Sequence, residues 1–211
     1  MVVKSNPKAS KLKSQEIEDL IKASYKNSKE ASTIGKKYNL TLDSQLSSPE
    51  QKVFIDKKGK PILVARGSTA SSVSQLARDW LISDALIAVG GSKLDPRQAR
   101  TQEVYNKVVE KYKKPVALVG HSLGGHLVEN VKTNKNDKIV TYNKAVGLGD
   151  VGKRIRDNQY DIRTGGDLVS GLSLTQKYKK GNNITIENTK FGNPITLHSP
   201  EFISRVGNKL I

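Results

Sequence analysis

Residues 115–125 have the sequence PVALVGHSLGG, a short apolar run that ends in the pattern G-x-S-x-G. This pattern predicts a nucleophile elbow, in which a buried strand delivers Ser122 to a sharp turn and a helix leaves on the other side. Gly120 and Gly124 leave space for such a turn, where side chains would crowd the backbone. The alternative is an ordinary glycine-rich turn between a strand and a helix, with a serine that has no chemical role.

A serine hydroxyl is a poor nucleophile at neutral pH and needs a base that is itself oriented by a carboxylate. The chain has three histidines, His121, His126 and His198. His121 adjoins the nucleophile and is expected to point away from it, and His126 lies on the helix after the elbow. By elimination, and because the base follows the nucleophile and the acid in such chains, His198 is predicted as the base. The alternative is a surface histidine at the start of the last helix.

The orienting carboxylate then falls between Ser122 and His198. Asp167 follows a predicted strand and two glycines, at the edge of the sheet where catalytic groups gather. We therefore predict Asp167 as the acid, with Asp150 as the main alternative and an ordinary Asx turn as the explanation without catalysis. The remaining aspartates in this interval are Asp137, Asp157 and Asp161.

Two hydrogen-bond donors are needed to stabilise the oxyanion of a tetrahedral intermediate. One is the backbone N–H of Leu123, directly after the nucleophile. The second is expected in a loop after an earlier strand, where Gly67 permits a turn and Ser68 offers both a backbone N–H and a hydroxyl. Loss of one such donor usually raises the reaction barrier by about 3–4 kcal/mol.

Strand and helix patterns alternate along the chain, which predicts an α/β domain with a mainly parallel sheet flanked by helices. We expect a flexible basic arm over residues 1–13 and a single domain over residues 14–211 that begins with a helix and a β-hairpin. The predicted helices span residues 14–29, 95–112 and 125–131, with a last one starting at Ser199. Besides the run before Ser122, the predicted strands are 52–56, 61–66, 138–142, 159–163 and 183–187.

The 211 residues include 36 basic and 20 acidic side chains, for a net charge of +16. Such a charge favours an anionic membrane surface or, as the weaker alternative, nucleic acid, although a solvated lysine-rich surface is an equal explanation. The absence of cysteine excludes disulfides and cysteine-ligated metal sites. The first 13 residues lack the apolar core of a signal peptide, and residues 81–89 are too short to span a bilayer. We therefore expect a soluble protein with peripheral membrane contact.

These motifs together resemble the class 3 lipases, a family with the α/β-hydrolase fold. The resemblance spans residues 60–200 and rests on the order and spacing of the motifs. They are Arg66-Gly67-Ser68, Asp79-Trp80-Leu81, Asp84, Gly120-His121-Ser122-Leu123-Gly124-Gly125, Gly166-Asp167-Leu168-Val169 and His198. The chain departs from the family at Ala65, where an aromatic residue is common, and at Ser170-Gly171, where a proline is common.

The resemblance implies an α/β-hydrolase fold with Ser122 as nucleophile, Asp167 as orienting acid and His198 as base. It also implies an oxyanion hole formed by Ser68 and Leu123. Compact versions without cysteine are similar to lipase-like proteins of large DNA viruses and microbes, so a cytoplasmic or virion-associated location is expected.

The resemblance further implies a mobile lid between the Arg-Gly-Ser turn and the next helix, over residues 69–80. An amphipathic lid that opens on lipid would expose Val73, Leu76 and Trp80. The alternative, equally weighted, is that Trp80 is an anchor of the core.

The expected function is hydrolysis of the acyl esters of lipids, phospholipid or acylglycerol, through an acyl-serine intermediate and without metal or cofactor. Lysines near the site would recruit the enzyme to anionic phospholipid. One alternative is a catalytically idle hydrolase scaffold that binds a polyanion or serves as a virion structural protein. Another is a serine peptidase or thioesterase on the same fold.

Overall fold

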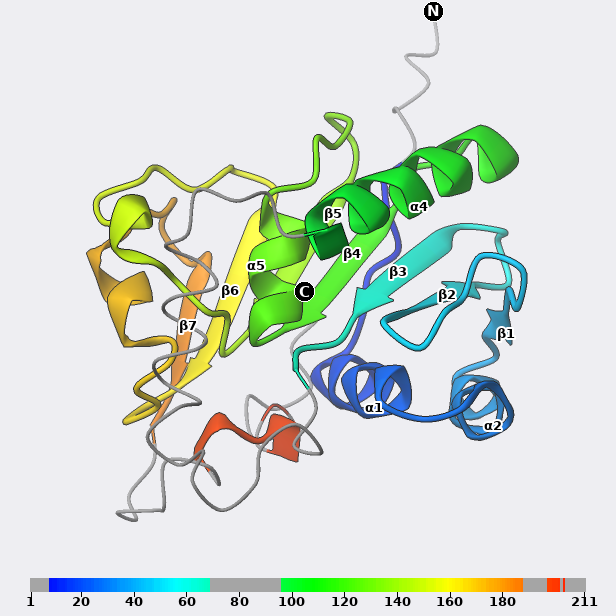
Figure 1. Ribbon diagram of the computed structural model, residues 1–211, viewed down its shortest axis with the longest axis horizontal. Helices are drawn as coiled ribbons and strands as arrows, with labels where there is room; N and C mark the ends of the chain where they lie inside the picture. The colour runs from blue at the N-terminus through cyan, green and yellow to red at the C-terminus, as the bar shows by residue number, and fades with distance from the viewer. Residues whose placement is uncertain (1–7, 69–95, 188–196, 202, 204–211) are drawn as a thin grey trace, which may run out of the picture.

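The structure is a computed structural model that describes residues 8–68, 96–187, 197–201 and 203. Over these residues the chain forms one seven-stranded sheet, in the order β1-β2-β3-β4-β5-β6-β7, with helices on both faces (Figure 1). The strands are β1 (Thr41–Leu42), β2 (Gln51–Ile55), β3 (Pro61–Ala65), β4 (Ala117–His121), β5 (Lys138–Tyr142), β6 (Gln159–Thr164) and β7 (Asn183–Ile186). The helices are α1 (Ser14–Ser24), α2 (Ser28–Lys37), α4 (Pro96–Tyr112) and α5 (Leu123–Glu129), with 3₁₀ turns η2 (Leu148–Asp150) and η3 (Gly171–Thr175).

The sheet is antiparallel at one end and parallel over the rest. Strands β1, β2 and β3 pair antiparallel, and β2 and β3 form the predicted hairpin, with Ile55 opposite Pro61. From β3 to β7 every neighbouring pair is parallel. The predicted α/β architecture with a mainly parallel sheet is therefore confirmed. Because each parallel strand lies beside its predecessor, the segments that follow β3, β4 and β6 all begin at the same edge of the sheet.

Two apolar layers, one on each face of the sheet, form the core. On one face α1 packs Ile17, Leu20 and Ile21 against alternate residues of the strands, among them Val119 of β4. On the other face lie α4 and α5 (Figure 1), and their apolar residues pack against the intervening residues of the strands, such as Leu118. The central strands are thus buried on both sides, which explains why β4 is a continuous apolar run and not an alternating one.

The sequence patterns predicted most helices and strands, but not the boundaries of those near the N-terminus. The expected helix 14–29 is two helices, because Asn27 caps α2 by accepting the N–H of Glu30 at 2.9 Å. The elbow helix starts at Leu123, two residues before the predicted start at Gly125. Neither α2 nor the short strand β1 was expected.

Within the described residues no helix is both long and apolar enough to cross a membrane.

Residues 8–13, expected to belong to a flexible arm, instead pack against the domain. The Ala9 N–H donates to the Asn136 carbonyl at 3.2 Å, and the Ser10 hydroxyl donates to Asp56 at 2.7 Å. Leu12 is only 1% exposed and belongs to the same apolar layer as α1. The physical reason is that Ala9, Ser10 and Leu12 are small or apolar and become buried, while the lysines between and beside them stay in solvent. Residues 1–7 lie outside the described part of the chain.

The buried position of Leu12 generates a test of this packing. Leu12→Ala should lower the free energy of unfolding by about 2–5 kcal/mol, because it removes buried methyl groups and leaves a cavity. The exposed neighbour provides the control, since Lys11→Ala should change stability by no more than about 0.5 kcal/mol. Urea unfolding of the two variants measures the difference. Equal stability of both would mean that the segment is not packed as described.

Candidate active site

Ser122 occupies a strained turn at the carboxyl end of β4. Its backbone angles are φ 55° and ψ −126°, in a region that residues other than glycine rarely adopt. The Ser122 N–H donates to the Tyr142 carbonyl at 3.1 Å, and the Ser122 carbonyl accepts the N–H of Gly125 at 2.9 Å and of Ala145 at 3.1 Å. The turn is therefore held from both sides, by the end of β5 and by the first turn of α5.

The two glycines around Ser122 are required by close contacts of backbone with backbone. A Cβ atom on Gly120 would overlap the Gly124 carbonyl, and one on Gly124 would overlap the carbonyl of Ala65. Helix α5 can therefore approach β3 and β4 only without side chains at these positions. This is the steric reason for the G-x-S-x-G spacing, and it leaves the strand, turn and helix arranged as the sequence predicts.

Asp167 and His198 form a hydrogen-bonded pair near this edge of the sheet. Asp167 follows β6, in a turn where Gly166 has φ 84°, and its Oδ1 lies 3.0 Å from Nδ1 of His198. The Ser170 hydroxyl and N–H donate to the other oxygen at 2.6 and 3.1 Å. Burial alone would raise the pKa of Asp167, but the hydrogen bonds from His198 and Ser170 outweigh it and lower that pKa. Asp167 is thus an ionised, fixed acceptor.

His198 reaches this position because its segment is tied to two strand ends. The Asn143 side chain, just after β5, donates to the Leu197 carbonyl at 2.9 Å and accepts the N–H of Thr164 at 2.7 Å. The second ring nitrogen, His198 Nε2, is buried and has no hydrogen-bond partner among the described residues. It makes no hydrogen bond to the Ser122 hydroxyl in this structure, as is common before substrate binds. A buried acceptor without a partner is the feature that a general base offers.

A second histidine links the elbow to the segment that carries His198. The rings of His121 and His198 lie 5.1 Å apart, and His121 Nε2 is 2.8 Å from the His198 carbonyl oxygen. On its other side, His121 Nδ1 is 2.7 Å from the hydroxyl of Tyr25, the residue that follows α1. That hydroxyl also accepts the N–H of Gly67 at 2.8 Å.

The direction of each hydrogen bond in this chain follows from its partners. A carbonyl oxygen only accepts, so His121 Nε2 carries a proton. Burial, and the nearby His198, lower the pKa of His121 to about 3, so its ring is neutral and Nδ1 accepts. Burial raises the pKa of Tyr25 to about 12, so its hydroxyl keeps the proton that it donates to His121. Tyr25 therefore joins three segments that are distant in the sequence.

This arrangement was not predicted from the sequence. His121 was expected only to point away from the nucleophile, and no role was predicted for Tyr25. A buried histidine directly before the nucleophile, together with a tyrosine at the end of an amphipathic helix, was the available signal. It did not indicate that the two residues meet, because they lie 96 residues apart.

The segment predicted to supply the second oxyanion donor lies against Ser122. A Cβ atom on Gly67 would be 2.8 Å from Cβ of Ser122, and Ser68 follows it with an exposed side chain. Arg97 of α4 donates to the Arg66 carbonyl at 2.7 Å and so holds the start of this segment. Leu123 is the first residue of α5 and adjoins Ser122 directly. The structure thus places Gly67 against the serine and Leu123 directly after it, and Ser68 is the neighbour of Gly67 in the chain.

The other aspartates that the sequence left open have different partners. Asp150 lies 3.9 Å from Nδ1 of His126 and 3.2 Å from Nζ of Lys153, on the α5 side of the sheet. Asp137 accepts the Tyr105 hydroxyl at 2.6 Å and caps a turn. Neither is bonded to His198. Of these carboxylates, Asp167 is the one that the structure pairs with it.

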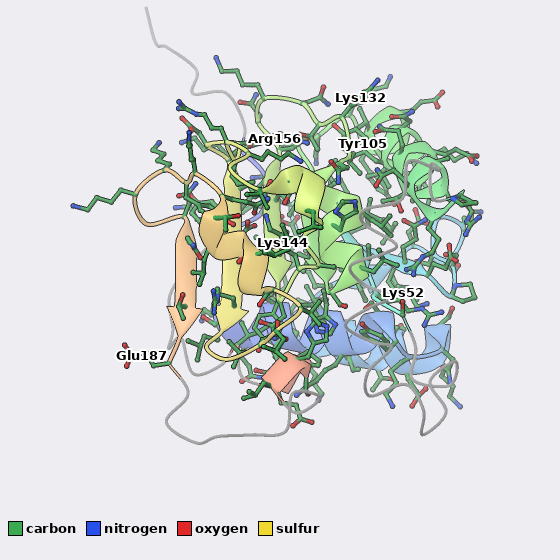
Figure 2. All side chains as sticks on the ribbon, turned by 60° about the vertical axis from the view of Figure 1, so that its left-hand side comes forward. Lys52, Tyr105, Lys132, Lys144, Arg156 and Glu187 are labelled. Carbon is green, nitrogen blue, oxygen red and sulfur yellow. The ribbon has the colours of Figure 1, made fainter. Side chains whose placement is uncertain are left out.

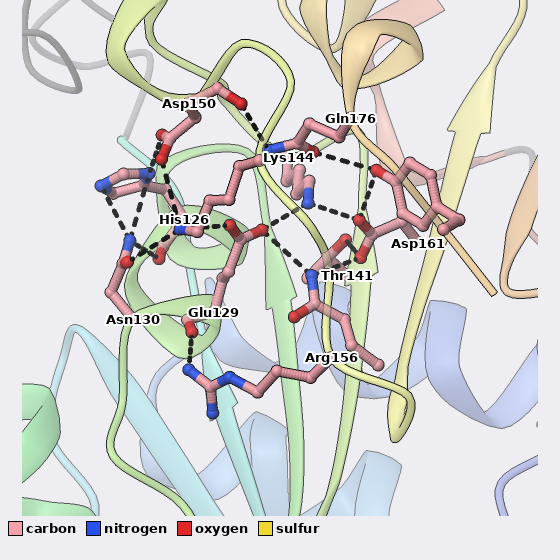
Figure 3. A network of polar contacts seen from close by, with 12 residues as sticks. His126, Glu129, Asn130, Thr141, Lys144, Asp150, Arg156, Asp161 and Gln176 are labelled. Atoms are coloured by element: carbon pink, nitrogen blue, oxygen red, sulfur yellow. Dashed lines mark hydrogen bonds and ion pairs between the residues drawn. The ribbon is translucent and has the colours of Figure 1, made fainter.

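Asp161 belongs to a buried charge network behind the elbow (Figure 3). Lys144 is 1% exposed and makes ion pairs with both Glu129 of α5 and Asp161 of β6. Figure 2 shows Lys144 inside the molecule, whereas Lys132 projects from its surface. Burial acts to raise the pKa of Glu129, but the charges of Lys144 and Lys153 dominate and lower it to about 2. The network fixes α5, which carries the elbow, to the sheet.

The predicted lid falls outside the described residues. Val73, Leu76 and Trp80 all lie in the segment 69–95, so neither the lid nor the core-anchor interpretation of Trp80 is tested. Within the described part of the chain, no group of three or more His, Cys, Asp or Glu side chains is arranged to hold a metal ion.

A comparison of the sequence with protein-family models finds no match, and a search of curated proteins also finds none. The resemblance to class 3 lipases therefore stays a prediction that rests on the motifs and their order.

The charge network predicts how stability depends on pH. Lys144→Met should lower the free energy of unfolding by about 3–5 kcal/mol at pH 7, because it leaves buried carboxylates without their main counter-ion. The pKa of Glu129 lies below its ordinary 4.5 in the folded protein, so its ion pairs stabilise the fold above that pH and fade as the pH falls toward about 2. The difference in free energy of unfolding between the wild type and Lys144→Met should therefore become smaller as the pH falls.

Urea unfolding of wild type and variant between neutral pH and pH about 3 measures this change. Lys179→Met, at an exposed lysine, is the control and should follow the wild type throughout. A deficit that stays constant over this range would contradict the role given to the ion pairs.

Proposed function

We propose that this protein is a serine carboxylic ester hydrolase with the α/β-hydrolase fold, similar to the class 3 lipases. One observation carries the proposal. A serine in a strained turn lies at the same sheet edge as a hydrogen-bonded Asp167–His198 pair, and the buried His198 Nε2 has no hydrogen-bond partner in the described part of the chain. Backbone strain at a serine, at the same sheet edge as a histidine that a carboxylate orients, supports a catalytic role.

In the proposed reaction, His198 takes the proton of the Ser122 hydroxyl as its oxygen attacks the carbonyl carbon of an ester. Asp167 keeps Nδ1 protonated and stabilises the imidazolium that forms. The N–H groups of Leu123 and Ser68 stabilise the oxyanion. The intermediate collapses when His198 protonates the departing alcohol, and the acyl-serine is then hydrolysed by a water that His198 activates.

Lipid acyl esters, of phospholipid or acylglycerol, are the proposed substrates. The resemblance of the motifs supports this class, and the net charge of +16 favours recruitment to an anionic lipid surface. The predicted lid with Val73, Leu76 and Trp80 stays part of this proposal. Activity on anionic phospholipid vesicles should therefore exceed activity on neutral vesicles at low salt, where charge attraction is least screened.

Removal of the nucleophile tests the reaction. Ser122→Ala should reduce fatty-acid release from anionic phospholipid vesicles by about 10⁴-fold or more, because the acyl-serine can no longer form. Ser28→Ala, at an exposed serine of α2, should release fatty acid at the wild-type rate. Release that persists in Ser122→Ala would contradict the proposed nucleophile.

If the folded wild type released no fatty acid from either phospholipid or acylglycerol, the proposed lipid hydrolysis would be contradicted. A panel of thioester and peptide substrates would then separate a related hydrolase from an inactive scaffold that binds polyanions.

The hydrogen bonds of Tyr25 predict a positioning role. Tyr25→Phe removes the hydroxyl that fixes Gly67 and His121, so kcat should fall by about 10- to 100-fold while KM changes little. Tyr160→Phe is the matched control, since no hydrogen bond of its hydroxyl is present among the described residues, and its kcat should stay unchanged. Steady-state kinetics with a soluble short-chain ester, together with thermal unfolding, make the comparison. An unchanged kcat in Tyr25→Phe would refute the positioning role.

A further inference from the structure

A cavity of about 470 Å³ opens between residues 8–12, the end of α2 and the β2–β3 turn. This volume lies within the range of small-molecule sites. The residues that line the cavity include Lys11, Tyr38, Asp56, Lys57, Lys58 and Ile62. The proposed ester hydrolysis uses none of these residues.

The cavity is separate from the candidate active site. Ile62 lines it at the start of β3 and pairs with Ala117 at the start of β4, whereas Ser122 follows the other end of β4. The two places are therefore about 16 Å apart along the strand direction. A ligand in the cavity would lie at the opposite edge of the parallel strands from the serine.

Hydrogen bonds fix the lysine-bearing turn on one side of the cavity. Asp56 accepts the N–H groups of Lys58 and Lys60, each at 2.8 Å, and its other oxygen accepts the Ser10 hydroxyl. The Lys60 ammonium in turn donates to the Lys8 carbonyl. The carboxylate is thus engaged in shaping the turn, and segment 8–12 is held beside it.

Positive charge is in excess around the opening, where five lysines face two carboxylates. The side chains of Lys8, Lys11, Lys57 and Lys58 are exposed, and none of them makes an ion pair among the described residues. Burial first, and then the charges of Lys11 and Lys8, lower the pKa of Lys138 nearby. Crowded ammonium groups of this kind attract a multiply charged anion.

One wall of the cavity is aromatic. Tyr38 lines it and is only partly buried, and its hydroxyl donates to Asp19 at 2.6 Å, which restrains the ring. Leu12, Leu40 and Ile62 lie beneath the cavity, are at most 4% exposed, and belong to the layer that packs against α1. An inorganic anion would contact only the lysines, whereas a ligand with an apolar or aromatic body would also pack against Tyr38.

We propose that this cavity binds a small phosphate-bearing ligand, with its phosphate at Lys11, Lys57 and Lys58 and its apolar or aromatic body against the ring of Tyr38. Lysine ammonium groups bind phosphate as point charges, and the exposed ones can turn toward it without disturbing the fold. The phosphate group has two sources, a soluble nucleotide or the headgroup of a phospholipid, and both present this chemistry.

Calorimetric titration of the full chain tests the proposal with three probes: ADP, short-chain phosphatidic acid as monomers, and inorganic tripolyphosphate. The cavity variant replaces Lys11, Lys57 and Lys58 by Gln. A matched control replaces the exposed Lys135, Lys179 and Lys180 by Gln, so both variants lose the same charge. Thermal unfolding checks that both are folded, and the Ser122→Ala protein should bind like the wild type.

We expect the wild type to bind ADP or phosphatidic acid more tightly than it binds tripolyphosphate. The affinity of the cavity variant for that probe should be lower by about tenfold or more, because a hydrogen bond to a charged group contributes at least that factor. The affinity of the control variant should stay unchanged. Which of the two probes binds tells whether the phosphate source is soluble or lipid. Equal weakening in both variants, no binding of either probe, or tripolyphosphate bound as tightly would each overturn the proposal.

Discussion

The approach of helix α5 to strands β3 and β4 governs the rest of this molecule. Gly120 and Gly124 allow the backbones to touch, and the chain then has to turn from strand to helix within the single residue Ser122. That requirement explains the strained φ of the serine, which the hydrogen bonds to Tyr142 and Ala145 hold in place. The serine therefore lies at the carboxyl edge of the sheet, because it directly follows β4.

The parallel order of the strands brings the remaining groups to the same edge. Asp167 follows β6, Gly67 follows β3, and His198 is tied there through Asn143. The hydrogen-bonded chain from Gly67 through Tyr25 and His121 to the His198 carbonyl links these pieces. Backbone strain is tolerated at Ser122 because its surroundings are held from several independent elements, which is the condition for a preorganised site.

Charged side chains have different roles in the core and at the surface. Lys144, buried between Glu129 and Asp161, anchors α5 and is neutralised by its partners. Around the cavity at the opposite edge, Lys57 and Lys58 are exposed on a turn that Asp56 shapes, and their charge stays available. The net charge of +16 hides this distinction. A buried lysine requires paired carboxylates, whereas a solvated one is free to meet an external anion.

The sequence by itself determined the features that depend on neighbouring residues. Apolar runs predicted β4, β5 and β6 within a residue or so, and the glycine spacing indicated the turn at Ser122, because both depend on local sterics and periodicity. The order of Ser122, Asp167 and His198 along the chain also indicated Asp167 as the acid and His198 as the base. The tertiary structure alone decided which distant groups meet. The pairing of Tyr25 with His121 joins residues 96 positions apart, and the burial of Leu12 in a lysine-rich segment depends on a layer assembled from several elements. Such contacts leave no periodic trace in the sequence, because the hydrogen bonds and apolar surfaces that select them exist only once the sheet has formed.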